Sequence, residues 1–112
     1  MEEGISRKPV KVSVEFDIHS THIYDYTLDT FGYFQAERYQ DKIEKALETL
    51  HGFYLAYPEC RHIPTKSRMY RNIILDAHLI IYRITDERIE VLDIIHSASS
   101  IGKIRGVRNV RL

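Results

Sequence analysis

Three β-type runs stand close together in the second half of the chain, and they constrain the fold more than any other feature. They cover residues 69–75, 79–85 and 89–96 and are rich in isoleucine, leucine, valine and tyrosine, which favour strands. Only Asp76-Ala77-His78 and Asp86-Glu87-Arg88 separate them. Connections this short join antiparallel neighbours in hairpins, so the sequence predicts a three-stranded antiparallel meander.

The first half of the chain supplies one more strand and a helical layer. Residues 10–16 alternate apolar and polar side chains with the period of a half-buried strand. Asp17 or Ser20 can then cap a first helix, and residues 33–57 form a second, strongly amphipathic one that ends at Pro58. We expect an α+β fold in which this helical hairpin packs on one face of a roughly four-stranded antiparallel sheet, with the first strand at an edge.

The length of 112 residues fits a single domain. We expect a flexible N-terminus over residues 1–9, one domain over residues 10–100, and a basic C-terminal extension of the same domain over residues 101–112. The extension contains no acidic residue. Its apolar spacing fits a short helical turn or an extra edge strand equally well.

The ends and the cysteine content bear on location. The N-terminus is charged and lacks the apolar core of a secretory signal, and no apolar run is long enough for a membrane span. Cys60 is the single cysteine, so no intrachain disulfide can form. We expect a cytoplasmic protein that has no membrane association and a half-buried thiol.

The formal net charge is zero, but the charges are separated along the chain. Residues 1–57 carry ten acidic and six basic side chains, whereas residues 58–112 carry six acidic and ten basic ones. Either these charges solvate two faces, or the C-terminal half presents a cationic surface to a partner.

The order strand, helix, helix, meander resembles the RelE/ParE superfamily of toxins from type II toxin–antitoxin, or plasmid stabilisation, systems. The local motifs that carry the resemblance are Phe31-Gly32, Ala36, Leu50, Pro58, Arg71, Ile80-Ile81-Tyr82-Arg83-Ile84 and the run from Ile89 to His96. They cover residues 10 to about 100. The resemblance implies the fold expected above.

The two branches of this superfamily imply different activities. RelE-like members are ribosome-dependent mRNA endoribonucleases (mRNA interferases), which need cationic side chains around the scissile phosphate. ParE-like members bind and inhibit DNA gyrase. When Tyr82 is aligned with the matching tyrosine of the superfamily, the positions of two RelE-like arginines hold Leu79 and about Ile74, and the lysine-rich stretch before them is reduced to Lys66. The resemblance therefore favours the ParE-like branch and a non-enzymatic inhibitor.

The residue types suggest candidates for either activity. A ribonuclease could use Arg71, Arg83 and His96, because arginine binds phosphate and histidine exchanges protons near neutral pH. A target-binding surface could use Arg71, Arg83, Lys103, Arg105, Arg108 and Arg111. The strand arginines and His96 are equally consistent with structural roles, as cross-strand partners and as a ring that hydrogen-bonds the backbone.

Neither a metal site nor a cofactor site is expected. His19 and His22 lie three residues apart, as two ligands on one helix face would, but no third ligand accompanies them. The chain has no phosphate-binding glycine loop and no nucleophile motif.

The resemblance implies a cognate antitoxin that is short, acidic and partly disordered, and that folds into the groove between the helical hairpin and the sheet. We therefore expect a hetero-oligomer with the antitoxin. The further partner is DNA gyrase or, alternatively, the ribosome and its mRNA. A third possibility is a nontoxic interaction module of the same fold.

Overall fold

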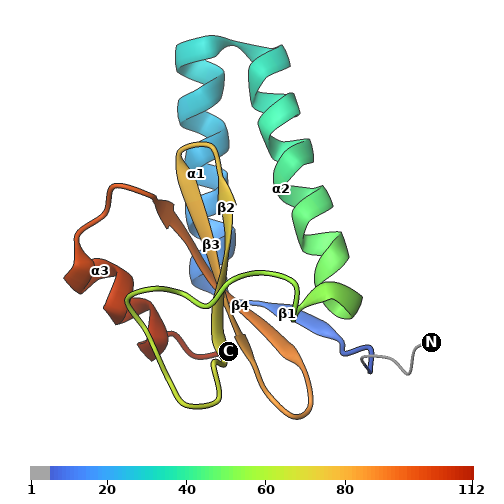
Figure 1. Cartoon of the computed structure of the whole chain (residues 1–112). Coiled ribbons are helices and arrows are strands. Elements are labelled where there is room, and N and C mark those ends of the chain that lie inside the picture. The colour runs from blue at the N-terminus through green and yellow to red at the C-terminus, as the bar shows by residue number, and fades with distance from the viewer. Residues whose placement is uncertain (1–5) are drawn as a thin grey trace.

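The computed structural model describes residues 6–112 of the chain. The elements follow the order β1 (Val10–Val12), α1 (Val14–Phe31), α2 (Tyr33–Phe53), β2 (Tyr70–Leu75), β3 (His78–Ile84), β4 (Ile89–His96), α3 (Ile101–Gly106) and a 3-10 turn, η1 (Val107–Asn109). The predicted α+β fold is confirmed: α1 and α2 form a helical hairpin beside the sheet, and α3 lies on the other side of the strands (Figure 1).

The first strand is shorter than the alternation of residues 10–16 predicts. It ends at Val12, and Ser13 caps α1 in place of the predicted Asp17 or Ser20. The Ser13 hydroxyl accepts a hydrogen bond from the backbone N–H of Phe16 at 2.9 Å and donates one to the Leu92 carbonyl at 2.6 Å. The Ser13 hydroxyl binds a backbone N–H of the first helical turn, which has no partner within the helix. The helix therefore begins at Val14, four residues earlier than a cap at Asp17 would place it.

The two long helices meet at Gly32, as predicted. This glycine has φ 93° and ψ 175°, a conformation that side-chain-bearing residues rarely adopt, and the chain reverses there. Helix α2 stops at Phe53, before the predicted end at residue 57. The residues after it form a turn, in which the N–H of Ala56 donates to the Phe53 carbonyl at 2.9 Å.

The four-stranded sheet has the order β1-β4-β3-β2. The predicted meander is confirmed, because β3 runs antiparallel to both β2 and β4. The sheet as a whole is mixed rather than entirely antiparallel, since β1 pairs with β4 in parallel, with Val10 opposite Ile89 and Val12 opposite Val91. The two helices, β2 and β3 together form the long connection between β1 and β4 that such a parallel pair requires.

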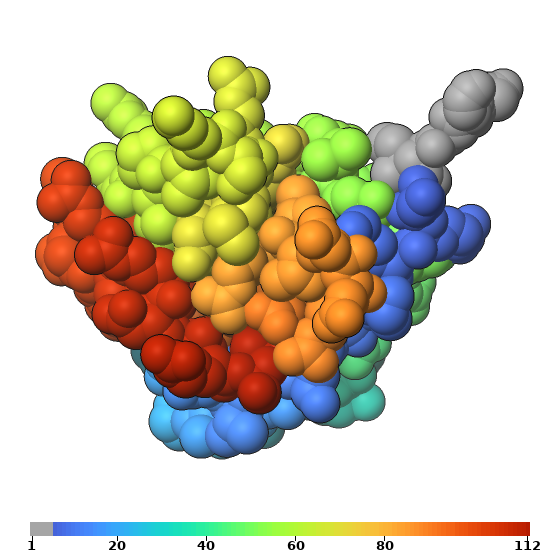
Figure 2. All heavy atoms as spheres, turned by 90° about the horizontal axis from the view of Figure 1, so that it is seen from below, coloured from blue at the N-terminus to red at the C-terminus, as the bar shows by residue number. Residues whose placement is uncertain are grey.

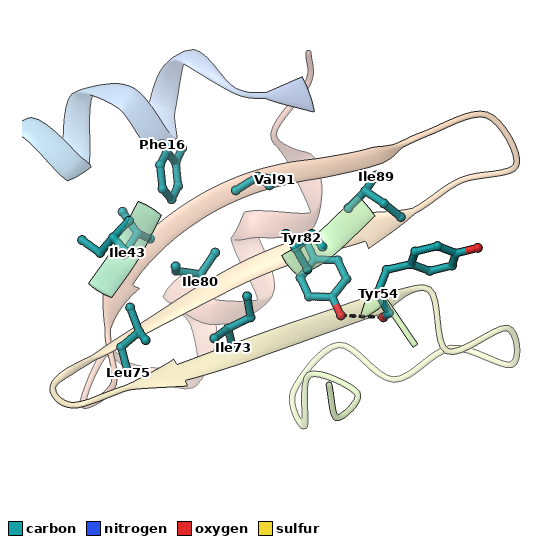
Figure 3. Packing of buried hydrophobic residues seen from close by; sticks show 11 residues of the cluster. Phe16, Ile43, Tyr54, Ile73, Leu75, Ile80, Tyr82, Ile89 and Val91 are labelled. Carbon is teal, nitrogen blue, oxygen red and sulfur yellow. Dashed lines mark hydrogen bonds between the residues drawn. The ribbon is translucent and has the colours of Figure 1, made fainter. Parts of the chain in front are cut away.

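Each face of the sheet has its own apolar core. Between the sheet and the helical hairpin, Phe16 and Ile43 pack towards Ile80, Tyr82 and Val91, and the Tyr82 hydroxyl donates to the Tyr54 carbonyl at 2.6 Å (Figure 3). Burial raises the pKa of the Tyr82 hydroxyl, which therefore stays protonated and can donate this bond.

The opposite face is covered by the C-terminal extension (residues 101–112, called the tail below) and by the α2–β2 connector (residues 54–69). Ile104 and Val107 of the tail pack with Cys60 and Ile63 of the connector. Figure 2 shows the tail, in red, lying against the yellow-green connector. The tail is thus a helical turn rather than an extra edge strand. Because β4 is covered on both faces, its residues from Ile89 to Ile95 are all buried.

The expected flexible N-terminus, residues 1–9, falls partly outside the described residues. Its last four residues are hydrogen-bonded to the domain: the Tyr54 hydroxyl donates to the Ser6 carbonyl, and the N–H of Lys8 donates to the His51 carbonyl. Cys60 is buried rather than half-buried, and burial raises the pKa of its thiol. Within residues 6–112, none of the helices has the length and apolar character of a membrane span.

Candidate functional site

Arg71 lies on the edge strand β2, on the sheet face that carries the helical hairpin. Its guanidinium donates to the carbonyls of Leu55 and Tyr57 at 3.1 and 3.0 Å, and to that of Arg68 at 3.0 Å. These carbonyls belong to the α2–β2 connector, where the helix has ended and no helical N–H can bind them. Arg71 therefore holds the connector against the edge of the sheet.

Arg83 points to the opposite face. It forms an ion pair with Glu90 of β4, in which Nη2 lies 2.7 Å from Oε1, and only 16% and 11% of the two side chains are exposed. Burial opposes the charged form of Glu90, but hydrogen bonds from Arg83 and Arg88 outweigh it and lower the pKa of that carboxyl. The same guanidinium donates to the carbonyls of Arg108 and Val110 at 3.2 and 3.3 Å. Arg83 thus binds the tail to the sheet.

The remaining predicted cations lie on the outer side of the tail. Ser100 caps α3 by accepting a hydrogen bond from the N–H of Lys103, and the apolar side chains of the tail face the sheet. The basic side chains of the tail are exposed: Lys103, Arg105, Arg108 and Arg111. These four residues are called the tail cations below.

His96 ends β4 on the helical side of the sheet. Its ring lies 5.6 Å from that of His78, the residue opposite it in the register, and its Nδ1 accepts a hydrogen bond from the N–H of Ala98 at 3.0 Å. The Nδ1 of His78 and the Tyr39 hydroxyl are 2.7 Å apart. Burial, together with the nearby His96, lowers the pKa of His78.

The three residues suggested for a ribonuclease do not come together. Arg83 lies on one face of the sheet, whereas Arg71 and His96 lie on the other face, towards its two ends. His96 lies opposite His78 in the register, and His78 is five residues from Arg83 on β3. At roughly 3.3 Å per residue, this separation corresponds to about 17 Å. No single phosphate can contact all three.

The positions of the two RelE-like arginines are directly opposite each other. Ile74 and Leu79 are cross-strand partners on β2 and β3. Ile74 is 68% exposed and Leu79 packs against the core beneath the tail. Two aliphatic side chains at these positions can neither bind a phosphate nor stabilise its negative charge.

A groove of about 590 Å³ lies between the helical hairpin and the turn joining β2 to β3. Its apolar part includes Ile23, Tyr26 and Phe31, of which Tyr26 and Phe31 are 65% and 63% exposed. Its polar part includes Arg38, Lys42, His78 and His96. Asp76 is the acidic residue of the lining, and Lys42 pairs with it at 3.0 Å. The groove thus combines apolar and basic surface, which suits an acidic amphipathic segment.

Sequence reasoning did not find Tyr39 and His78 as parts of this groove. The amphipathic pattern of residues 33–57 predicts Tyr39 only as part of a helix, and the sequence places His78 in a polar break, whereas the structure makes His78 the first residue of β3. No spacing along the chain indicates that these two side chains meet. Within residues 6–112, no group of three histidine, cysteine or acidic side chains is arranged to hold a metal ion.

Comparison with known proteins now adds to this geometry. Residues 10–101 match the model of a family described as ParE toxin of type II toxin-antitoxin system, parDE. A solved structure described as a chromosomal ParDE TA system from P. aeruginosa superposes with a TM-score of 0.67 at 16% identity, over 82% of this chain and 98% of that chain. Curated protein sequences give no match. The family model spans most of the chain, and we conclude that this protein belongs to the ParE toxin family of type II toxin–antitoxin systems.

Proposed function

We propose that this protein is a cytoplasmic toxin that binds and inhibits DNA gyrase, and that a cognate antitoxin neutralises it by occupying the groove. The observation that carries the proposal is the match of residues 10–101 to the ParE toxin family. Inhibition by binding needs a complementary surface rather than a catalytic group, and the chain offers such a surface in two places.

The tail cations are the surface that we assign to gyrase. Lys103, Arg105, Arg108 and Arg111 are exposed along a segment that Ile104 and Val107 fix against the sheet. A fixed cluster of like charges attracts an acidic surface of a partner and orients the encounter. Arg71 and Arg83 support this surface, since they bind backbone carbonyls of the connector and of the tail.

The ribonuclease alternative has less support. The aliphatic pair Ile74 and Leu79 stands where RelE-like enzymes carry arginines. Arg71 and Arg83 already bind carbonyl groups or Glu90, so phosphate binding would have to break these contacts.

A supercoiling assay tests the gyrase proposal. The purified protein should block supercoiling of relaxed plasmid by gyrase or trap gyrase–DNA cleavage complexes. The double variant Arg105→Glu/Arg108→Glu should lose this inhibition at least tenfold, while Lys45→Glu, which reverses an exposed charge on α2, should retain it. Normal supercoiling at saturating wild-type protein would disprove the proposal. Cuts at codon positions in mRNA after induction would instead support the ribonuclease.

A pair of phenylalanines tests the antitoxin part. Phe31 lies in the groove and Phe53 lies outside it, and both are 63% exposed, so replacing either with serine should leave the fold intact. We expect Phe31→Ser to weaken binding of the antitoxin about tenfold, through loss of a buried aromatic contact, and Phe53→Ser to leave it unchanged. Equal affinities of the two variants would show that the groove is not the binding site.

A further inference from the structure

Four histidines and a lysine converge at one end of the groove. A smaller cavity of about 180 Å³ is lined by His19, His22, His78, His96 and Lys103, which we call the histidine cluster. The cavity shares His22, Ile23, His78 and His96 with the groove, so the two spaces adjoin each other. Its side chains come from α1, from the ends of β3 and β4, and from α3.

The hydrogen bonds of two rings fix what they can offer a ligand. Because the N–H of Ala98 donates to Nδ1 of His96, the proton of this neutral ring must lie on Nε2. His78 can donate or accept at Nδ1, because its partner there is the Tyr39 hydroxyl. Within the described residues, neither Nε2 atom has a hydrogen-bond partner, so both are available to an acceptor in the cavity.

The acidic groups near the cluster already have hydrogen-bond or ion-pair partners. Asp93 is buried and lies 2.6 Å from Nδ1 of His19, and it also accepts a hydrogen bond from the N–H of Ile94 at 2.8 Å. Asp76 pairs with Lys42. The cavity lining itself contains no carboxylate. An oxyanion that enters would therefore meet donors and positive charge, with no free carboxylate of the lining to repel it.

We propose that the histidine cluster binds a carboxylate of the antitoxin segment that fills the groove, and that it gains a proton when the carboxylate enters. This inference rests on the proposed function. The occupant is a carboxylate-bearing peptide because the cavity adjoins the apolar groove, so that one amphipathic segment can place apolar side chains on Tyr26 and Phe31 and an acidic one among the imidazoles. His78 is the site of proton uptake, since its Nδ1–H can donate to the Tyr39 oxygen once both ring nitrogens are protonated.

The direction of the pH dependence follows from the free protein. Burial and the adjacent His96 lower the pKa of His78, so this ring is neutral at pH 7. A bound carboxylate favours the charged ring and raises its pKa in the complex. The affinity is then highest below the pKa of the free protein and falls as the pH rises through the pKa of the complex. The titratable and charged groups that face the cluster are His19 and His22 from α1, Tyr39, Arg38 and Lys42 from α2, Asp76 from the β-turn, Asp93 from β4 and Lys103 from α3.

Acetate is the first probe, because it presents a carboxylate without any peptide. Imidazole resonances of the full chain are followed by NMR during titration with sodium acetate at pH 6.0, with sodium chloride at equal ionic strength as the control. We expect His78 and His96 to shift and the apparent pKa of His78 to rise, while His62, in the connector and outside both cavities, stays unchanged. If acetate moves neither ring, or if only inorganic phosphate does, the cluster is not a carboxylate site, whatever the function of the protein.

The second probe is the cognate antitoxin, with its binding measured by calorimetry at pH 6.0 and 8.0. Wild type and the control His62→Gln should bind at least fivefold more tightly at pH 6.0 and take up protons. The variant His78→Gln/His96→Gln should lose this pH dependence. The single variant His96→Gln changes only an exposed ring and is measured as well, in case the double variant misfolds. Tight binding with an unchanged pH dependence in both variants overturns this inference and leaves the proposed function intact. Absence of antitoxin binding by the wild type overturns the proposed function itself.

Discussion

Arg83 binds Glu90 across β3 and β4, with Nη2 of the arginine 2.7 Å from Oε1 of the carboxylate, and the same guanidinium reaches two carbonyls of the C-terminal tail. One side chain thus joins two strands and the segment that carries the tail cations.

Replacing Arg83 with methionine should lower the free energy of unfolding by about 2–3 kcal/mol, because Glu90 would lose the better buried of its two partners. Urea denaturation measures this loss. Hydrogen exchange at residues 104–110 should also become faster, since the tail loses two hydrogen bonds. Arg88→Met is the matched control: Arg88 also binds Glu90 but is 35% exposed, so its loss should cost less than about 1 kcal/mol. Equal losses in the two variants would contradict a special role for Arg83.

Acid should weaken this same contact. The folded-state pKa of Glu90 lies below its ordinary value because Arg83 and Arg88 outweigh the effect of burial. The pair therefore contributes stability above the unfolded pKa, which is about 4.3 for glutamate, and this contribution is lost as the pH falls through the folded pKa. The difference in unfolding free energy between wild type and Glu90→Gln should shrink as the pH falls from 6 to 3. A constant difference over this range would rule out the linkage.

The Ser13→Ala variant should be destabilised by about 1–3 kcal/mol, since its buried hydroxyl both caps α1 and bonds the Leu92 carbonyl. Ser100→Ala is the control, because Ser100 caps the short helix α3 from an exposed position and should cost about 0.5–1 kcal/mol. Thermal unfolding followed by circular dichroism measures both. A smaller loss for Ser13→Ala than for Ser100→Ala would contradict the assigned cap.

Alanine should have opposite effects at two glycines of the helical hairpin. At Gly32, with φ 93° and ψ 175°, alanine should cost about 1–3 kcal/mol, although no atom lies within 4 Å of the added Cβ. At Gly52, inside α2 and equally open, alanine should stabilise the protein by about 0.5–1 kcal/mol through its better helix propensity. Chemical denaturation of the two variants decides this. If both variants lost stability, steric crowding rather than backbone conformation would determine which side chains these positions accept.

The meander and the helical hairpin could be predicted from sequence because their signals are local. Short polar breaks force neighbouring strands into hairpins, and Gly32 ends one amphipathic stripe before the next begins. The start of α1 was harder, because Val12, Val14 and Phe16 follow the period of a strand, whereas in the structure Val14 and Phe16 are helical and Val14 is exposed. The helix begins directly after Ser13, and the hydrogen bond that holds Ser13 in place reaches the carbonyl of Leu92, which is far away in the sequence.

The candidate site was less predictable for the same reason. Sequence identified the cations but not their contacts, so Arg83, which is mostly buried against Glu90, could not be told from the exposed Arg105. The histidine cluster combines residues of α1, the ends of β3 and β4, and α3, and only the packing of α1 on β4 brings them together. No spacing along the chain indicates such a meeting.

The parallel pairing of β1 with β4 has a consequence for synthesis on the ribosome. The first strand to emerge has no partner until the last strand has followed it, because Val10 binds opposite Ile89. Contacts so distant in sequence form late and slow the folding of a chain. A nascent polypeptide therefore cannot complete its sheet until β4 has left the ribosome, and both apolar cores stay incomplete until then.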